Sequence, residues 1–245
     1  MFRTGLFLKE DNLPDWLRLY FKLIRIAFRS RLQYRADFIT GFTGIILMNI
    51  VILGMIGILV SRFSDINGWT LWEVVFLYCL WILGHSIFSL FFFHIRSLED
   101  YLVQGTFDQF LIRPASALVL FLGREVQYIG FADMGFGIGG AILAYTNLGL
   151  SWNWAEWLFF IVAILSGTII EMTLNLMIAC IAFWTGRSRR ANGLLMRLGV
   201  MIQQYPLDIY GTVFRVVVTG LIPIAFMNYY PSLLLLGKLG NNPFW

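Results

Sequence analysis

The sequence predicts an all-α fold: a polytopic integral membrane helical bundle that forms a single transmembrane domain over residues 1–245. Composition is the first reason, because 59% of the residues are hydrophobic and only 13% are charged, whereas soluble domains carry about a quarter charged residues. The second reason is the length of the apolar runs. Residues 38–60 contain no charge, and residues 157–183 contain only Glu171. A membrane-spanning helix needs about 20 such residues.

Residues 14–35 are predicted to form an amphipathic helix before the first span. Its apolar residues recur at i, i+3, i+4 and i+7 between Trp16 and Phe28, and Pro14 suits a first helical turn. A second face carries the basic residues Arg18, Lys22, Arg25 and Arg29. Such a helix lies in the membrane interface, where anionic lipid attracts its basic face. A cytosolic arm packed on a partner is the alternative.

Four spans are predicted next, followed by a broken hydrophobic segment. The spans are at residues 36–61, 70–93, 115–148 and 155–184, and the broken segment is at 190–236. The third span starts partly in the interface, because Arg124 and Glu125 precede its charge-free part. Within that part, Gly135 and Gly139 have the spacing that permits close approach of two helices.

Proline residues interrupt the last segment at Pro206, Pro223 and Pro231. This pattern favours a short helix plus a re-entrant piece that is buried in protein, or a fifth span. A single helix over about 212–236 is the alternative. The chain is therefore predicted to contain five spans, or four spans and a re-entrant segment.

The distribution of basic residues places the N-terminus in the cytosol. Eight of the 18 Lys and Arg residues precede position 36, and four more lie in the loop at 186–197. The loop at 61–70 carries one, and the loop at 145–155 carries none. Loops rich in Lys and Arg stay inside, so this alternation predicts that residues 94–114 are also cytosolic.

Residues 94–114, called the island below, form a polar segment between the second and third spans. Apolar residues recur there at helical spacing, at Leu98, Tyr101 and Leu102 and then at Phe107, Phe110 and Leu111. This pattern predicts one or two short helices on the membrane surface, broken near Gly105 and stopped by Pro114. A shaped cytosolic element in a membrane protein indicates a partner in the cytosol.

Sequence motifs for catalysis or for cofactor and metal binding are absent. There is no Walker Gly-x-x-x-x-Gly-Lys-Ser/Thr sequence, no G-x-S-x-G and no HExxH. His85 and His94 lack ligand partners at metal spacing, and Cys79 and Cys180 fall inside apolar segments. We therefore expect a protein that is not an enzyme and that binds no cofactor, metal or nucleic acid.

Polar residues inside the spans are candidates for a translocation path. Glu171 shares one helix face with Thr168 and Asn175, and this stripe either lines a substrate route or makes hydrogen bonds between helices. Asp133 and His85 complete the set. For Asp133 we expect a structural partner, and for His85 a hydrogen bond in helix packing.

Three segments of the chain resemble a known family. The island sequence Gly105-Thr-Phe-Asp-Gln-Phe-Leu-Ile-Arg-Pro114 resembles the first intracellular loop of ABC-2 type transporter permease subunits, in a bacterial subfamily with a separately encoded ATPase. Tyr205-Pro-Leu-Asp-Ile-Tyr210 and Ile222-Pro-Ile-Ala-Phe-Met-Asn-Tyr-Tyr-Pro231 are similar to the C-terminal pattern of that subfamily.

The resemblance implies a permease subunit of an ATP-driven exporter in the bacterial inner membrane, with the ABC-2 (type II exporter-like) architecture. It would form half of the pathway with a second permease, the same or a homologous chain, and dock two copies of a cytosolic ATPase that hold ATP and Mg. Six spans are expected in the family, so a last transmembrane helix would be missing or unrepresented in this sequence. Arg197 inside the last segment also departs from the family pattern.

The resemblance also implies roles for particular segments and residues. The helix over 16–28 would flank the ATPase. The implied ATPase-coupling residues are Glu99, Asp100, Leu102, Gly105, Thr106, Phe107, Asp108, Leu111 and Arg113.

The sequence is also compatible with two other classes of protein. The runner-up is a non-transport membrane scaffold or sensor that recruits a cytosolic partner, and a membrane-embedded enzyme comes third. The aromatic-rich interior with few charges suits a hydrophobic or amphipathic cargo, and Glu171 favours a cation.

Overall fold

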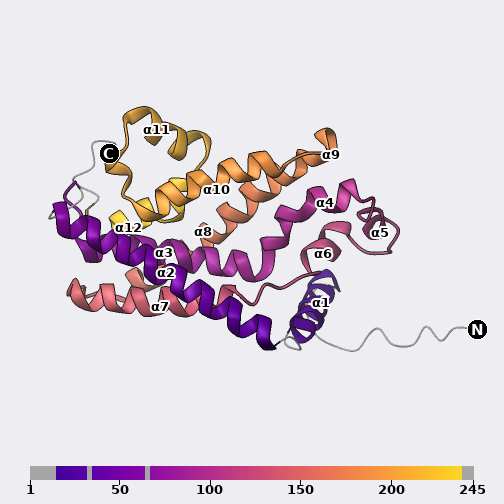
Figure 1. Cartoon of the computed structure of the whole chain (residues 1–245), viewed down its shortest axis with the longest axis horizontal. Coiled ribbons are helices and arrows are strands. Elements are labelled where there is room, and N and C mark those ends of the chain that lie inside the picture. Colours follow the sequence, from indigo (N-terminus) through magenta and orange to yellow (C-terminus); the bar gives the residue numbers. More distant parts are fainter. Residues whose placement is uncertain (1–14, 32–34, 64–66, 239–245) are drawn as a thin grey trace, which may run out of the picture.

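The computed structural model describes residues 15–31, 35–63 and 67–238, and the regular elements over these ranges are helices (Figure 1). By length and composition, three helical segments in this part of the chain could cross a membrane: Phe38–Arg62, Leu71–Val103 and Trp154–Thr185. The predicted all-α membrane bundle is therefore confirmed.

Helix α1, at Asp15–Arg31, confirms the helix predicted before the first span. Its Leu19 and Leu23 pack on an apolar cluster that includes residues of α6 (Ala117–Leu122). Figure 1 shows α1 beside α6, at the end of the molecule where the island lies. Helix α1 therefore packs against other residues of its own chain. Its position in a membrane interface stays a prediction.

Helix α3 (Leu71–Phe92) is the centre of the bundle, and its main packing partners are four long helices. These are α2 (Arg35–Phe63), α7 (Gly130–Asn147), α8 (Trp154–Cys180) and α10 (Arg189–Gln204). In the segment that contains α3, 78% of the most apolar 18 residues are buried. The corresponding share is 17% for α2 and 22% for α8. The exposed faces of α2 and α8 are apolar, as expected of helices that meet lipid or another subunit.

Glycines bring α7 close to α3, but they are not the predicted pair. A Cβ added at Gly137 would lie 2.7 Å from a side-chain atom of α3, and one at Gly140 would lie 2.5 Å from the Cys79 sulfur. Nothing lies within 4 Å of a Cβ built at Gly135 or Gly139. The contact with α3 uses Gly137 and Gly140 because positions three apart share a helix face as well as positions four apart do. Which face meets α3 is set by the packing.

The predicted span at 115–148 is divided in the structure, which corrects it to two helices. Helix α6 and helix α7 are separated by irregular residues at 123–129. The guanidinium of Arg124 lies 4.8 Å from the ring centroid of Tyr101, and the Tyr101 hydroxyl donates to Glu125 Oε1 at 3.1 Å. These contacts with the island require the polar residues to leave a continuous apolar helix.

The segment after α10 is broken, as predicted, and the alternative of a single helix over 212–236 is wrong. Five short elements follow α10: η2 (Leu207–Ile209), α11 (Thr212–Val216), the π-helical η3 (Val217–Leu221), η4 (Ile224–Met227) and α12 (Tyr229–Leu235). Pro206 and Pro223 lie between elements, because proline lacks the N–H that a helix interior needs.

Asp208 ties this broken segment together and to the loop before α3. Its Oδ2 accepts from the Trp69 indole N–H at 2.8 Å, and its Oδ1 accepts from the Tyr229 hydroxyl at 2.7 Å. Arg215 donates to the Asp208 carbonyl oxygen at 2.7 Å. The Asp in the 205–210 motif therefore has a structural role.

The loops gather at two opposite ends of the bundle (Figure 1). Trp69 reaches Asp208, and the Trp152 indole donates to the Leu235 carbonyl at 3.3 Å, so the loops before α3 and α8 share one end with α12. The island and the loop before α10 lie at the other end, where Glu99 joins them. Successive loops therefore lie at alternate ends of the bundle, as the distribution of basic residues predicts. The assignment of the island end to the cytosol stays a prediction.

Candidate functional site

Two short helices form the island, as predicted. Helix α4 covers Leu98–Val103 and α5 covers Asp108–Leu111. Between them Gly105 has φ +68°, a backbone conformation that favours glycine, and the Phe107 N–H donates to the Tyr101 carbonyl at 3.0 Å. The break near Gly105 is therefore confirmed.

The aromatic residues of the island face inward. The ring centroid of Phe107 lies 5.7 Å from that of Phe110, 6.3 Å from that of Phe121 and 5.2 Å from that of Phe183 in α9 (Ala182–Thr185). Leu102 packs against the same cluster. Leu102 and Phe107, which the family resemblance implies as coupling residues, thus hold the island against the bundle.

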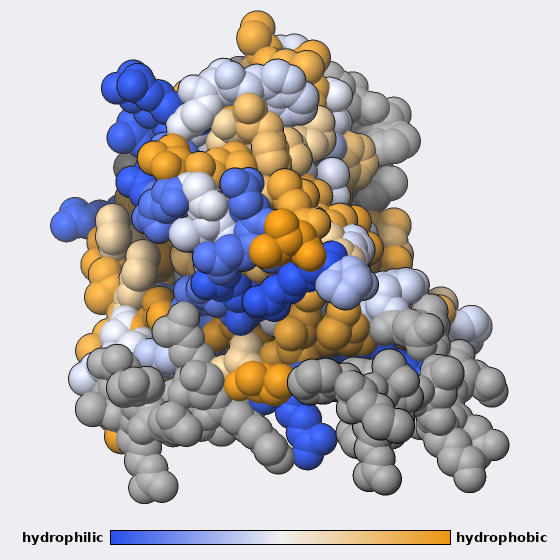
Figure 2. Space-filling model, turned by 90° about the vertical axis from the view of Figure 1, so that its right-hand side faces the viewer, coloured by the Kyte–Doolittle hydropathy of each residue, from blue (hydrophilic) through white to orange (hydrophobic). Residues whose placement is uncertain are grey.

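The outward face of the island combines charged and exposed apolar residues. Leu111 is 62% exposed and Ile112 is 83% exposed, while Asp108 and Arg113 beside them are also exposed. Figure 2 looks onto this end of the molecule and shows hydrophobic patches among hydrophilic residues. Sequence reasoning did not single out Ile112. The sequence signal for Ile112 is that it is apolar but lies outside the helical face shared by the other apolar residues of the island.

Glu99 fastens the island to the start of α10. Its Oε2 accepts from the backbone N–H of Ser188 at 2.5 Å and of Arg189 at 2.7 Å, and Arg189 also forms an ion pair with Asp100. These backbone hydrogen bonds hold the pKa of Glu99 below its ordinary value, as expected for a carboxylate at a helix N-terminus. The side chain of Glu99 therefore joins the island to the start of α10.

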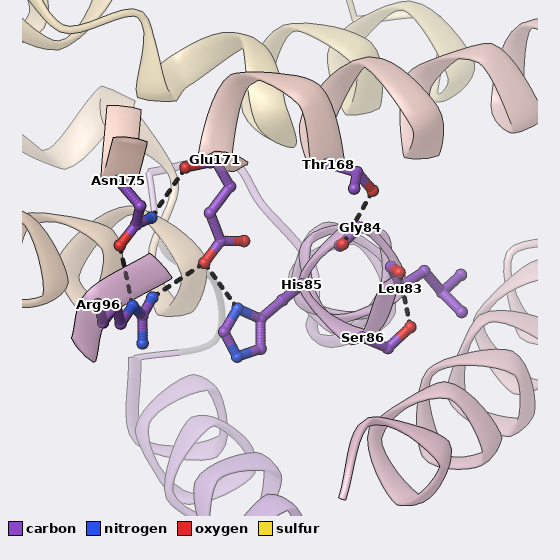
Figure 3. A network of polar contacts seen from close by, with 8 residues as sticks. All are labelled: Leu83, Gly84, His85, Ser86, Arg96, Thr168, Glu171 and Asn175. Atoms are coloured by element: carbon purple, nitrogen blue, oxygen red, sulfur yellow. Dashed lines mark hydrogen bonds and ion pairs between the residues drawn. The ribbon is translucent and has the colours of Figure 1, made fainter. Parts of the chain in front are cut away.

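A buried polar site lies deeper in the bundle, between α3 and α8 (Figure 3). Glu171 Oε1 lies 2.8 Å from His85 Nδ1 and 3.2 Å from an Arg96 guanidinium nitrogen. Arg96 Nε donates to Asn175 Oδ1 at 2.9 Å. Glu171 and Asn175 are 7% and 1% exposed. Buried charges require such pairing, so this network is the main polar feature inside the bundle.

These residues line a cavity of about 240 Å³. Its wall is otherwise mostly apolar and comes from α2, α3, α8, α10, η4 and η1 (Phe93–Ser97). The lining residues are Met48, Trp81, His85, Phe93, Arg96, Glu171, Leu174, Asn175, Leu195, Met196, Gly199, Val200, Gln203, Ile224 and Met227. A cavity that is mainly apolar, with a few convergent polar groups, is typical of a small-molecule site.

The structure separates the candidates for a translocation path into three places. His85, Glu171 and Asn175 line the cavity. Thr168 does not line it, and its hydroxyl donates to the Gly84 carbonyl at 2.9 Å. Asp133 does not line the cavity either, and it accepts a hydrogen bond from the Asn49 amide at 2.9 Å. Asp133 thus has the structural partner that we expected.

Arg96, Trp81 and Gln203 belong to the cavity but were not among the residues selected for a path. For Arg96 and Trp81, the sequence signal is their helical spacing from His85. Trp81 precedes His85 by four residues, and its ring stacks on the imidazole at a centroid distance of 4.6 Å. Arg96 follows His85 by 11 residues, which is close to three helical turns. No signal in the sequence separates Gln203 from its neighbour Gln204.

The residues that the structure describes contain no group of three or more His, Cys, Asp or Glu side chains that could hold a metal ion. The ionisable groups of the buried site form hydrogen bonds and ion pairs with one another instead. The site as described therefore presents groups suited to hydrogen bonding with a ligand.

The fold and these sites define a multi-pass membrane protein with a polar site inside the bundle and a shaped surface at one end. The chain matches the family described as ABC-2 family transporter protein over residues 45–245, and it belongs to that family. No curated protein and no solved structure matches it. The family makes the chain a permease of an ABC transporter, a transport subunit that associates with an ABC ATPase.

Proposed function

We propose that this chain is the permease subunit of an ATP-driven ABC exporter in the bacterial inner membrane, with its N-terminus in the cytosol. It pairs with a second permease subunit to form the translocation pathway. Two copies of a separate cytosolic ATPase, which bind ATP and Mg, dock on the island and drive transport. The cargo is hydrophobic or amphipathic.

The observation that carries this proposal is the mechanical connection between the island and the cavity. The helical run Leu71–Val103 joins α3 directly to α4. Glu99 of α4 holds the first residues of α10. Since α3 and α10 both line the cavity, a partner that moves the island would move two of its walls.

The face of the island supports docking of a protein. Leu111 and Ile112 expose apolar side chains beside the charged Asp108 and Arg113. Apolar anchors surrounded by polar residues are the usual composition of a protein interface. The inward cluster around Phe107 keeps the island in shape, so that force applied by an ATPase reaches the bundle.

The test is capture of the ATPase. Full-length chain is purified from gently solubilised native membranes, and co-purifying proteins are identified by mass spectrometry. We expect an ATPase with a Walker sequence. Ile112→Glu should reduce its recovery about tenfold, because one anchor side chain is worth more than about 1 kcal/mol.

Gln104→Glu is the matched control, because it adds the same charge to the exposed turn of the island without removing an apolar side chain. Recovery should then stay at the wild-type level. Failure to recover any such ATPase, even after cross-linking in the membrane, would favour the scaffold or sensor alternative.

A further inference from the structure

We propose that the cavity binds a neutral amphipathic molecule, with an apolar body and one uncharged head group that donates hydrogen bonds, such as a hydroxyl or an amide. The inference rests on the proposed function, for which it names the class of cargo. It differs from the cation that Glu171 alone would favour.

The charges of the cavity wall cancel. Arg96 and Glu171 are the Arg, Lys, Asp and Glu residues that line it, and a guanidinium nitrogen of Arg96 lies 3.2 Å from Glu171 Oε1. The Arg96 guanidinium also lies 5.1 Å from the ring centroid of Phe88 and 5.0 Å from that of Phe93. The Arg and Glu side chains of the wall therefore leave no net charge to compensate a charged ligand. Bringing an uncompensated charge into such a site is costly.

Two buried hydrogen-bond acceptors of the lining residues lack a donor in the described part of the chain. Glu171 Oε2 and Gln203 Oε1 are buried and have no hydrogen-bond partner among the residues that the structure describes. Both residues line the cavity, and they are 7% and 5% exposed. A buried acceptor without a donor is unfavourable, so a ligand that donates hydrogen bonds relieves this cost. A hydroxyl or amide does so without adding charge.

The body of the ligand is apolar because most of the wall is apolar. The exposed lining residues are Met48 of α2 with Met196 and Val200 of α10, at 60%, 48% and 43% exposure. The cavity thus opens on an apolar surface between these helices. A molecule dissolved among lipid chains can enter there without crossing water, which suits an amphipathic ligand.

The experiment uses the purified full-length chain in detergent micelles at pH 8 with three probes of equal chain length. They are ω-brominated undecyl alcohol, undecylamine and undecanoic acid. Bromine quenches a nearby indole, and Trp81 is the tryptophan that lines the cavity. We expect saturable quenching by the alcohol, with an affinity at least about tenfold tighter than that of the amine or the acid. Trp81→Phe should remove the saturable part.

Two variants then reverse the preference. Glu171→Gln leaves the Arg96 charge without its partner, so the acid should become the tightest probe. Arg96→Gln leaves the Glu171 charge, so the amine should become the tightest. Arg190→Gln is the matched control, because Arg190 is exposed in the first turn of α10 and does not line the cavity. It should keep the wild-type order.

Wild-type binding in which the amine or the acid equals or exceeds the alcohol would overturn the proposal, as would quenching by the alcohol that does not saturate. The ranking of the three probes on the wild-type chain tests the proposal by itself, even if a charge variant fails to fold. The assay contains no ATPase, so its result is separate from the test of the exporter. Binding of the alcohol without a recoverable ATPase would reject the exporter and keep the ligand site.

Discussion

Two carboxylates of this chain illustrate how the same residue type serves different purposes inside the bundle and at its end. Glu171 lies in α8 beside Arg96, and their side chains are 9% and 14% exposed. Glu99 and its neighbour Asp100 meet Arg189 at the surface, where the side chains of the ion pair are 41% and 66% exposed. The inner pair lies in a poorly solvated environment and is difficult to separate, whereas water and salt weaken the outer one. The inner pair therefore suits a rigid ligand-binding pocket. The outer pair suits a contact between two segments that move relative to each other.

The largest effect should come from removing one member of the inner pair. Glu171→Ala leaves Arg96 buried without its carboxylate, and we expect a loss of about 3–5 kcal/mol in the free energy of unfolding. Denaturant unfolding of the purified chain in micelles measures it. The double variant Glu171→Leu with Arg96→Met should recover most of the loss, because neither charge remains. A single-variant loss below about 1 kcal/mol would show that the pair is solvated like the outer one.

A smaller effect is expected within the island. Phe107 packs on Phe110 and Phe121, so Phe107→Asp places a charge in an aromatic cluster and should loosen the island by about 2 kcal/mol. Limited proteolysis of the permease alone should then cut near the turn at Gly105. Leu111→Asp is the matched control because Leu111 is exposed, and its island should stay resistant. Equal cleavage of both variants would contradict the inward role of Phe107.

The smallest effect should be at Glu99, and it should depend on pH. Glu99→Gln weakens the hydrogen bonds to the start of α10, at a cost of about 1 kcal/mol. The folded-state pKa of Glu99 is lowered. Its stabilisation is therefore present above the unfolded pKa of about 4.3 and is lost as the pH falls through the folded value.

Unfolding measured from neutral pH into this acidic range should show the difference between wild type and Glu99→Gln disappearing at low pH. Asp100→Asn removes only the exposed ion pair and should change stability by less than about 1 kcal/mol. A difference for Glu99→Gln that persists unchanged into acid would mean that the carboxylate does not hold α10.

Much of the fold could be predicted because the relevant signals are local. A charge-free run locates α2, a run with the single charge of Glu171 locates α8, and apolar spacing with basic residues opposite locates α1. Gly105, Pro206 and Pro223 interrupt helices because of their own backbone chemistry. The candidate site was predicted less completely. Helical spacing placed Glu171 and Asn175 on one face, but Arg96 comes from an element 75 residues away from Glu171 in sequence.

The sequence alone therefore determined that the protein is a helical membrane bundle and that the island is interrupted near Gly105. These depend on run length, spacing and residue type, which any window of the chain contains. The tertiary structure alone decided that Arg96 cancels the charge of Glu171, that Glu99 joins the island to α10, and that Phe107 faces inward. Each of these depends on which faces of distant helices meet, and that is settled by the packing of the whole bundle.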